Sequence, residues 1–292
     1  MVDFSLGFVI TVVQEKVKGI PEFRKIISGQ NIMAFSSNLA LVAQSIRTGY
    51  LLDIFAPQNP VALFSRLLED LRSDTRTRDC FASVLHLFEP SFDQSFFVNT
   101  RLLFHRIESF NQPATCLSFQ EHIGLRPVFV HLGASFEIVD PPTQIVQLLV
   151  SLLDLVSTSP TPSSHTLPSD IPMELAVALA AIFLDYPIAY VPSVSHQNAL
   201  SGKPLDFYEC SLTYFEGNGR REENPREITH TIMKFSSPVE LWTCRPNEYM
   251  QLQPQSVIEN LRNMFQKRIQ NLRGVRIIAV EHCTRTLQHV AF

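Results

Sequence analysis

The chain has 292 residues, of which 45% are hydrophobic and 18% charged. This is enough apolar material for one large domain or two modest ones, and too little charge for disorder. The net charge is -4 and the Lys and Arg residues are scattered, which argues against a nucleic-acid partner. The longest apolar runs, 145–156 and 173–184, are much shorter than the roughly 20 residues of a membrane span, so we expect no membrane partner.

Three apolar runs of strand length occur in the first half of the chain, at residues 50–56, 82–88 and 127–133. Each is continuously apolar, as strands buried on both faces are, and each lies beside a helical pattern. This alternation predicts parallel strands covered by helices.

Two helices are expected to follow a polar residue and a proline, at Asn59-Pro60 and Asp140-Pro141. Asn or Asp at the N-cap accepts a free backbone amide, and proline at the next position has no amide to leave unsatisfied. The first pair predicts an amphipathic helix. The second predicts a helix over 145–156, which is apolar on nearly every side and should be buried in the core, as should 173–184.

Residues 158–170, TSPTPSSHTLPSD, are rich in Ser, Thr and Pro. This composition predicts a flexible surface loop, because it cannot bury enough apolar area to offset the cost of ordering. The segment could also divide two domains. We expect a single domain over 1–292 instead, because the second half alone has few helices to cover its strands.

In the second half, runs at 205–214 and 230–235 flank a polar loop and predict a long antiparallel hairpin. Ser256 and Glu259 form a capping-box pattern that predicts the start of a helix, and a last strand is expected at 275–280. The expected fold class is therefore α/β. We expect a mixed, mainly parallel sheet with helices on both faces and an antiparallel hairpin in the C-terminal half.

The cysteines predict a reducing compartment. Their number is odd and their spacing wide, which suits free thiols in the cytoplasm or nucleus. They are Cys80, Cys116, Cys210, Cys244 and Cys283. Asp3 precedes the apolar segment at the N-terminus and no small-residue cleavage site follows it, so secretion is not expected.

Residues 182–208 read as an apolar helix, a Tyr-Pro-x-x-Tyr motif, a polar loop, Asn-x-Leu and a strand that opens with Pro-Leu, and Phe-Ser-x-Pro follows at 235–238. This order resembles the eukaryotic family typified by the human chromosome 1 open reading frame 74 protein, a family of unknown function. The matching residues are Tyr186, Pro187, Tyr190, Asn198, Leu200, Pro204, Leu205, Phe235, Ser236 and Pro238. The resemblance also places Asp53 on a family position. It implies no activity.

Four residues are candidates for binding a ligand. Asp53 lies near the end of a predicted parallel strand, where α/β sheets bind ligands, although it could equally cap its own loop. His131 and Ser135 follow another such strand in VHLGAS, where the resembling family has Asp-Val-Ser. Asn198 could contact a ligand or close an Asx-turn. If the two strands are neighbours, Asp53 and His131 should open on one edge of the sheet with Ser135 beside them, and Asn198 could join them from the second half of the chain.

No cofactor, metal or catalytic residue is expected. The segment NALSGKP has Gln197 where a phosphate loop needs its first glycine, and Pro204 where it needs a hydroxyl. Glu281, His282 and Cys283 are adjacent, and neighbours on a strand point to opposite faces, so they cannot converge on one metal.

These observations favour a non-enzymatic interaction or scaffold protein with an unknown protein partner. The alternative is an enzyme or small-ligand-binding protein with a pocket near Asp53 and His131.

Overall fold

The computed structural model describes residues 5–111, 126–157, 159–193, 198–216, 226–244 and 249–288. Cys116, Gln197 and residues 217–225 of the polar loop in the predicted hairpin lie outside these ranges. The helices are α1 (Leu6–Gly19), α2 (Pro21–Ile26), α3 (Gly29–Ala43), α4 (Pro60–Ser73), α5 (Arg78–Phe81), α6 (Thr100–Asn111), α8 (Thr143–Ser157), α9 (Met173–Phe183), α10 (Glu240–Thr243), the 3-10 helix η1 (Met250–Leu252) and α11 (Pro254–Ile269). The strands are β1 (Gly49–Leu51), β2 (Val84–Glu89), β3 (Gln94–Asn99), β4 (Val128–Leu132), β5 (Phe136–Val139), β6 (Ser164–Thr166), β7 (Ile188–Pro192), β8 (Pro204–Glu216), β9 (Arg226–Pro238) and β10 (Val275–Thr286).

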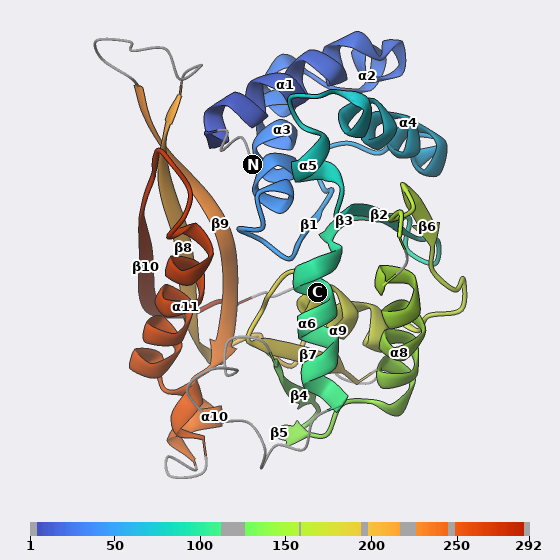
Figure 1. Cartoon of the computed structure of the whole chain (residues 1–292). Helices are drawn as coiled ribbons and strands as arrows, with labels where there is room; N and C mark the ends of the chain where they lie inside the picture. The colour runs from blue at the N-terminus through green and yellow to red at the C-terminus, as the bar shows by residue number, and fades with distance from the viewer. Residues whose placement is uncertain are drawn as a thin grey trace.

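The chain is a mixed α/β protein, but its strands form three separate sheets (Figure 1). Their orders are β1-β3-β2-β6, β5-β4-β7 and β10-β8-β9. Among the described strands only β2 with β6 and β4 with β7 pair in parallel. The expectation of a mainly parallel sheet is wrong, because β2–β3, β4–β5 and β8–β9 follow one another with little intervening chain and so pair antiparallel.

The predicted hairpin is present and longer than expected. β8 and β9 pair from Leu205 with Pro238 to Glu216 with Arg226. The run 50–56 is a strand only over Gly49–Leu51, because the chain leaves the sheet after the amide of Leu52 bonds the carbonyl of Ser95 (2.9 Å). Strands β3, β5, β6 and β7 were not among the predicted runs.

The predicted helix starts have mixed outcomes. Asn59 caps α4 as expected, its Oδ1 accepting from the amide of Ala62 (3.2 Å). Asp140 does not cap α8, which begins three residues later, at Thr143. Ser256 lies inside α11, whose first residue is Pro254. The capping box is wrong because this proline, at the first helical position, begins the helix three residues earlier, with Gln253 as its N-cap.

Part of the Ser/Thr/Pro segment is a strand rather than a loop. Ser164–Thr166 form β6, which pairs with β2. Arg72 of α4 donates to the carbonyls of Thr161 (2.8 Å) and Pro162 (3.1 Å) and to Ser163 Oγ (3.0 Å). Composition could not predict this order, because the stabilising guanidinium comes from a distant helix.

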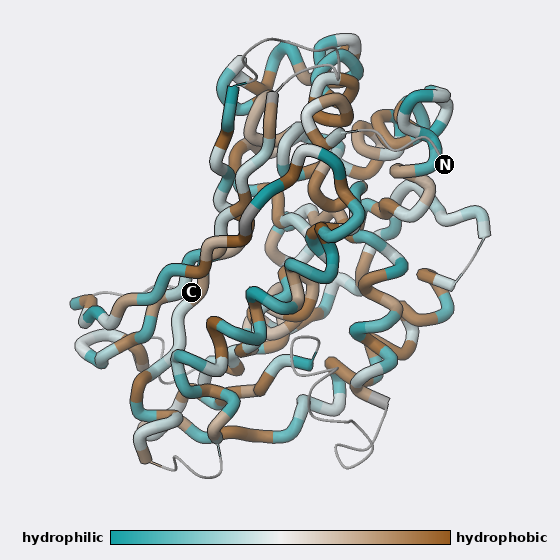
Figure 2. The backbone as a smooth tube through the Cα atoms, turned by 60° about the vertical axis from the view of Figure 1, so that its left-hand side comes forward, coloured by the Kyte–Doolittle hydropathy of each residue, from teal (hydrophilic) through white to brown (hydrophobic). Residues whose placement is uncertain are grey.

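Helices α8 and α9 pack into one core cluster with β2, β3 and α6. Leu149 and Leu179 are each 1% exposed, as the prediction of core helices requires. α8 is not buried on every side, since Val150 is 46% exposed. A second cluster joins α1, α3 and α4 to one face of the β10-β8-β9 sheet and to α11. Figure 2 turns the side of the molecule that carries this sheet forward and shows hydrophilic and hydrophobic stretches intermixed along the chain.

No helix among the described residues is long and apolar enough to cross a bilayer.

Candidate functional site

The four candidate residues do not converge. Asp53 follows β1 and is exposed, whereas His131 lies half-buried in β4, a strand of another sheet. Ser135 is exposed and donates to Glu137 Oε1 (3.0 Å). Asn198 is exposed in a turn, and its carbonyl accepts from the amide of Ser201 (2.9 Å). The expectation that Asp53 and His131 share one sheet edge is therefore wrong, and a ligand role for any of the four stays a prediction.

A groove of about 380 Å³ is bounded by α9, β7, β9 and the end of β1. Ala176, Val177 and Ala180 of α9 form an aliphatic wall. Phe92 and Met173 line it while remaining 38% and 49% exposed. Apolar surface left accessible inside a concavity is typical of binding sites.

The groove lies where three sheets each present an edge strand. β1, β7 and β9 are terminal strands of their sheets. They contribute Leu51, Ile188, Tyr190, Phe235 and Ser236 to the lining. The hydroxyl of Tyr190 donates to the carbonyl of Ser236 (2.7 Å), so β7 and β9 are joined at this point. Burial raises the pKa of Tyr190 and keeps this donor neutral.

Several residues of the family resemblance meet in this groove although they are distant in sequence. Those in the lining are Tyr186, Tyr190, Leu200, Phe235 and Ser236. The rings of Tyr186 and Phe235 lie 5.9 Å apart between centroids. The sequence pattern therefore marks one wall of a concave site.

An acidic cavity of about 260 Å³ lies beside the groove. Asp53, Asp93 and Ser95 line it, whereas Phe92 and Gln94 line the groove. Alternate residues from the end of the β2–β3 turn into the start of β3 thus line the two hollows. No cation lies within ion-pair distance of Asp53 or Asp93 among the residues described.

The turn that separates the two hollows is held by Glu89. This carboxylate is 1% exposed and accepts from the amides of Ser91 (2.8 Å) and Phe92 (2.9 Å). Asp93 adopts a positive φ of 53°, which Asp tolerates better than most residues. The fixed turn places the Phe92 ring at the groove and the Asp93 carboxylate at the acidic cavity.

The negative charge of Asp53 reaches the aromatic end of the groove. Burial raises the pKa of Tyr186, Arg47 lowers it, and Asp53 raises it further. Arg47 and Asp53 thus act on the Tyr186 hydroxyl with opposite signs.

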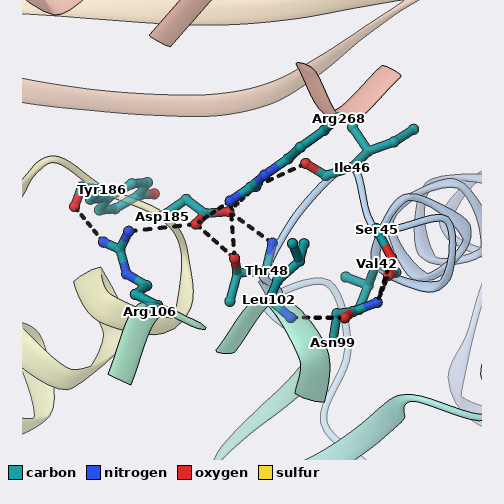
Figure 3. A network of polar contacts seen from close by, with 10 residues as sticks. All are labelled: Val42, Ser45, Ile46, Thr48, Asn99, Leu102, Arg106, Asp185, Tyr186 and Arg268. Atoms are coloured by element: carbon teal, nitrogen blue, oxygen red, sulfur yellow. Dashed lines mark hydrogen bonds and ion pairs between the residues drawn. The ribbon is translucent and has the colours of Figure 1, made fainter. Parts of the chain in front are cut away.

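A buried ionic network positions the walls of the groove (Figure 3). Asp185, between α9 and Tyr186, accepts from the amide (2.8 Å) and hydroxyl (2.7 Å) of Thr48 and from both terminal nitrogens of Arg268 (2.7 and 3.2 Å). Arg106 Nη1 lies 3.6 Å from Asp185, and its Nη2 donates to the carbonyl of Tyr186 (2.9 Å). The network joins α6, α9 and α11 to the segment before β1.

Asp185 stays ionised inside the protein. Burial alone would raise its pKa, but Arg268, Arg106 and the amide of Thr48 hold it well below its ordinary value. Asp185 is 1% exposed and Arg106 0%, so these groups position the walls of the groove from inside the protein.

Close packing brings β1 against α9. A Cβ on Gly49 would lie 2.6 Å from the carbonyl oxygen of Phe183, so a side chain there would push the strand away from the helix end. Leu51 consequently reaches the groove from β1.

Sequence reasoning missed Phe92, Asp93, Met173 and the Asp185 network. Asp185 carried a signal, since a charged residue directly follows the apolar run 173–184 and precedes the Tyr-Pro motif. Phe92 and Met173 carried none, because exposure of an apolar residue depends on tertiary packing.

Comparisons with protein-family models, with curated proteins and with solved structures find no match for this chain.

Proposed function

We propose that this chain is a non-enzymatic interaction protein whose groove binds a partner segment carrying apolar side chains next to a basic one. The observation that carries the proposal is the groove itself, with the exposed side chains of Phe92 and Met173 in its lining. Burying such side chains against a partner would remove apolar area from water, the main favourable term in association.

The adjacent acidic cavity is the reason to expect a basic residue in the partner segment. Asp53 and Asp93 are exposed carboxylates that share one cavity. A Lys or Arg beside the apolar anchor would complement them and speed association at low salt.

The lining of the groove favours binding over proton transfer. Its polar side chains are those of Gln94, Tyr186, Tyr190 and Ser236, and burial raises the pKa of both tyrosines. The enzyme alternative needs Asp53 beside His131, and these residues belong to segments of different sheets.

Selection of peptides from a random displayed library on the immobilised protein tests the proposal. We expect enriched peptides that combine aromatic or aliphatic residues with Lys or Arg. Their affinity should fall about tenfold or more with Met173→Asp, which places a charge in the lining of an apolar site. Asp53→Asn should weaken binding less and reduce its dependence on salt.

Val150→Asp is the matched control, because Val150 is a similarly exposed aliphatic residue (46%) on α8, outside the groove. It should leave peptide affinity unchanged. Equal binding to Met173→Asp and Val150→Asp, or no enrichment of peptides, would contradict the proposal.

A further inference from the structure

The long strand β10 leaves one edge open to a second strand. β10 pairs with β8 on one side and is the terminal strand of its sheet. It lies at the outer margin of the molecule in Figure 1. The ladder with β8 shifts register between Arg276 and Ile278 and then runs without interruption to Thr286. An edge of this length is a ready template for pairing with another chain.

The last three residues of β10 are exposed on both faces of the strand. Thr284, Arg285 and Thr286 are all exposed, although successive side chains point to opposite faces. The first half of β10 is covered, since Val275, Ile278 and Val280 pack into the core cluster that contains α11. A second strand can therefore lie beside residues 281–286.

The described part of the chain does not neutralise the charges on this edge. Glu281 lies opposite Glu209 of β8, and Glu209 is paired with Lys234 (2.9 Å). Arg285 lies opposite Leu205. Neither Glu281 nor Arg285 has an ion-pair partner in the part of the chain described, and they are about 13 Å apart along the strand, too far to pair with each other.

We propose that two copies of this chain pair through β10, antiparallel about a two-fold axis at Cys283. In this register Glu281 lies opposite Arg285 of the second copy, and Arg285 opposite its Glu281. Each Glu281, which lies opposite the like-charged Glu209 in its own sheet, thus gains the guanidinium of Arg285 from the second copy. An isologous contact of this kind closes on itself as a dimer, and the sheets join into one continuous sheet.

The register avoids a clash between the two copies of α11. Each α11 covers the half of β10 that includes Ile278 and Val280. Antiparallel pairing about Cys283 places these halves at opposite ends of the joined strands. The alternative register, Arg276 opposite Glu281, would need a regular edge across the shift at Arg276, whose guanidinium already lies 4.9 Å from the Phe215 ring.

The two Cys283 thiols report the register directly. Residues directly opposite in an antiparallel pair have Cα atoms about 4.5 or 5.5 Å apart, and both separations lie within the range of about 4.4–6.8 Å that a disulfide spans. Cys283 is half-buried and lines a hollow of about 520 Å³ with Glu281 and Arg285, so a small oxidant can reach it.

Sedimentation of the full chain over a dilution series tests the dimer. The wild type should sediment as a dimer that dissociates on dilution. Glu281→Arg and Arg285→Glu should each weaken it about tenfold, because each creates two like-charge pairs across the axis. The double variant Glu281→Arg with Arg285→Glu should recover wild-type affinity, which mere misfolding of a single variant would not permit. The groove variant Met173→Asp should dimerise normally.

Oxidation with diamide, which takes up the two electrons and two protons released on disulfide formation, tests the register. A covalent dimer should form in the wild type and in Cys244→Ser, and be lost in Cys283→Ser. A wild type that is monomeric throughout the series, single reversals without effect, or a crosslink that persists in Cys283→Ser would overturn the proposal.

Discussion

His86 lies in β2 between two hydroxyl groups. Its Nδ1 is 2.7 Å from Ser164 Oγ and its Nε2 is 3.1 Å from Ser95 Oγ. The side chain is fully buried, and burial lowers its pKa to about 3. A neutral imidazole can donate from one nitrogen and accept at the other, and a hydroxyl can serve either role. The residue joins β6 to the sheet as a neutral imidazole, because burial disfavours the charged form.

We predict that His86 makes the protein less stable in acid. The unfolded chain binds a proton near pH 6.5, whereas folded His86 stays neutral until about pH 3. The stability that comes from neutral His86 is fully present above about pH 6.5. It is lost as the pH falls from about 6.5 to about 3, and the free energy of unfolding then decreases by up to about 1.4 kcal/mol per pH unit. His86→Gln should remove this slope in urea denaturation measured from about pH 7 to about pH 4.

The control is His105→Gln, since the His105 side chain is 66% exposed. It should leave the slope unchanged. His230 should contribute a separate slope in both variants, because burial and then Arg47 lower its pKa to about 4. A wild-type slope in His86→Gln would show that His86 is protonated in the folded protein.

At the scale of elements, α8 is buried along one stripe only. Ile145, Leu149 and Leu152 are each 1% exposed, and Val150 lies on the opposite side. Leu149→Ala should lower the free energy of unfolding by about 2–5 kcal/mol, through lost burial and the cavity left behind. Val150→Ala should change it by less than about 0.5 kcal/mol. Chemical denaturation measures both, and similar values would mean that α8 is not a core helix.

Arg72 links α4 to the segment that precedes β6. Besides the three acceptors at 161–163, it donates to the carbonyls of Phe81 (3.2 Å) and Val84. We expect 161–166 to resist limited proteolysis in the wild type and to be cleaved readily in Arg72→Met, because that variant loses these donors and keeps much of the aliphatic stem. Arg66→Met, at a side chain that is 53% exposed, is the control. If the wild type is cleaved at 161–166 before other sites, this segment is the flexible loop that its composition predicts.

At the scale of the whole molecule, Asp185 connects segments that are distant in sequence. Asp185→Asn keeps the shape of the side chain. Asn, like Asp, also tolerates the positive backbone φ of 65° at position 185. The substitution leaves the Arg106 and Arg268 guanidiniums without their anion, which should cost about 3–5 kcal/mol of folding free energy. Asp53→Asn, at an exposed carboxylate, should cost less than about 0.5 kcal/mol.

Urea denaturation followed by both fluorescence and circular dichroism checks this prediction. The ring of Trp242, near β8, reports on the hairpin sheet through its bond to Asp206 (2.9 Å). If the unfolding transitions seen by fluorescence and by circular dichroism no longer coincide in Asp185→Asn, the network couples the unfolding of the sheets. A loss below about 1 kcal/mol would contradict the assigned role.

Local patterns predicted the parts of this protein that depend on neighbouring residues. Asn59 caps its helix because the cap, the proline and the free amide lie within a few residues of each other. The runs at 205–214 and 230–235 became β8 and β9, since a short connection allows only the antiparallel pair. Leu149 and Leu179 were placed in the core because they lie in the two longest apolar runs, and both are buried.

Tertiary structure decided what depends on distant partners. β1, the strand before Asp53, pairs with β3, whereas β4, which contains His131, pairs with β5 and β7. No periodicity in the sequence encodes which strands become neighbours. The buried charge of Asp185 is tolerated because Arg106 of α6 and Arg268 of α11 form ion pairs with it. By itself, the sequence determined the mixed α/β class, the core helices and the motif residues. The groove where those residues meet arises only when three sheets bring their edges together, because a concave surface is a property of packed elements and not of any one segment.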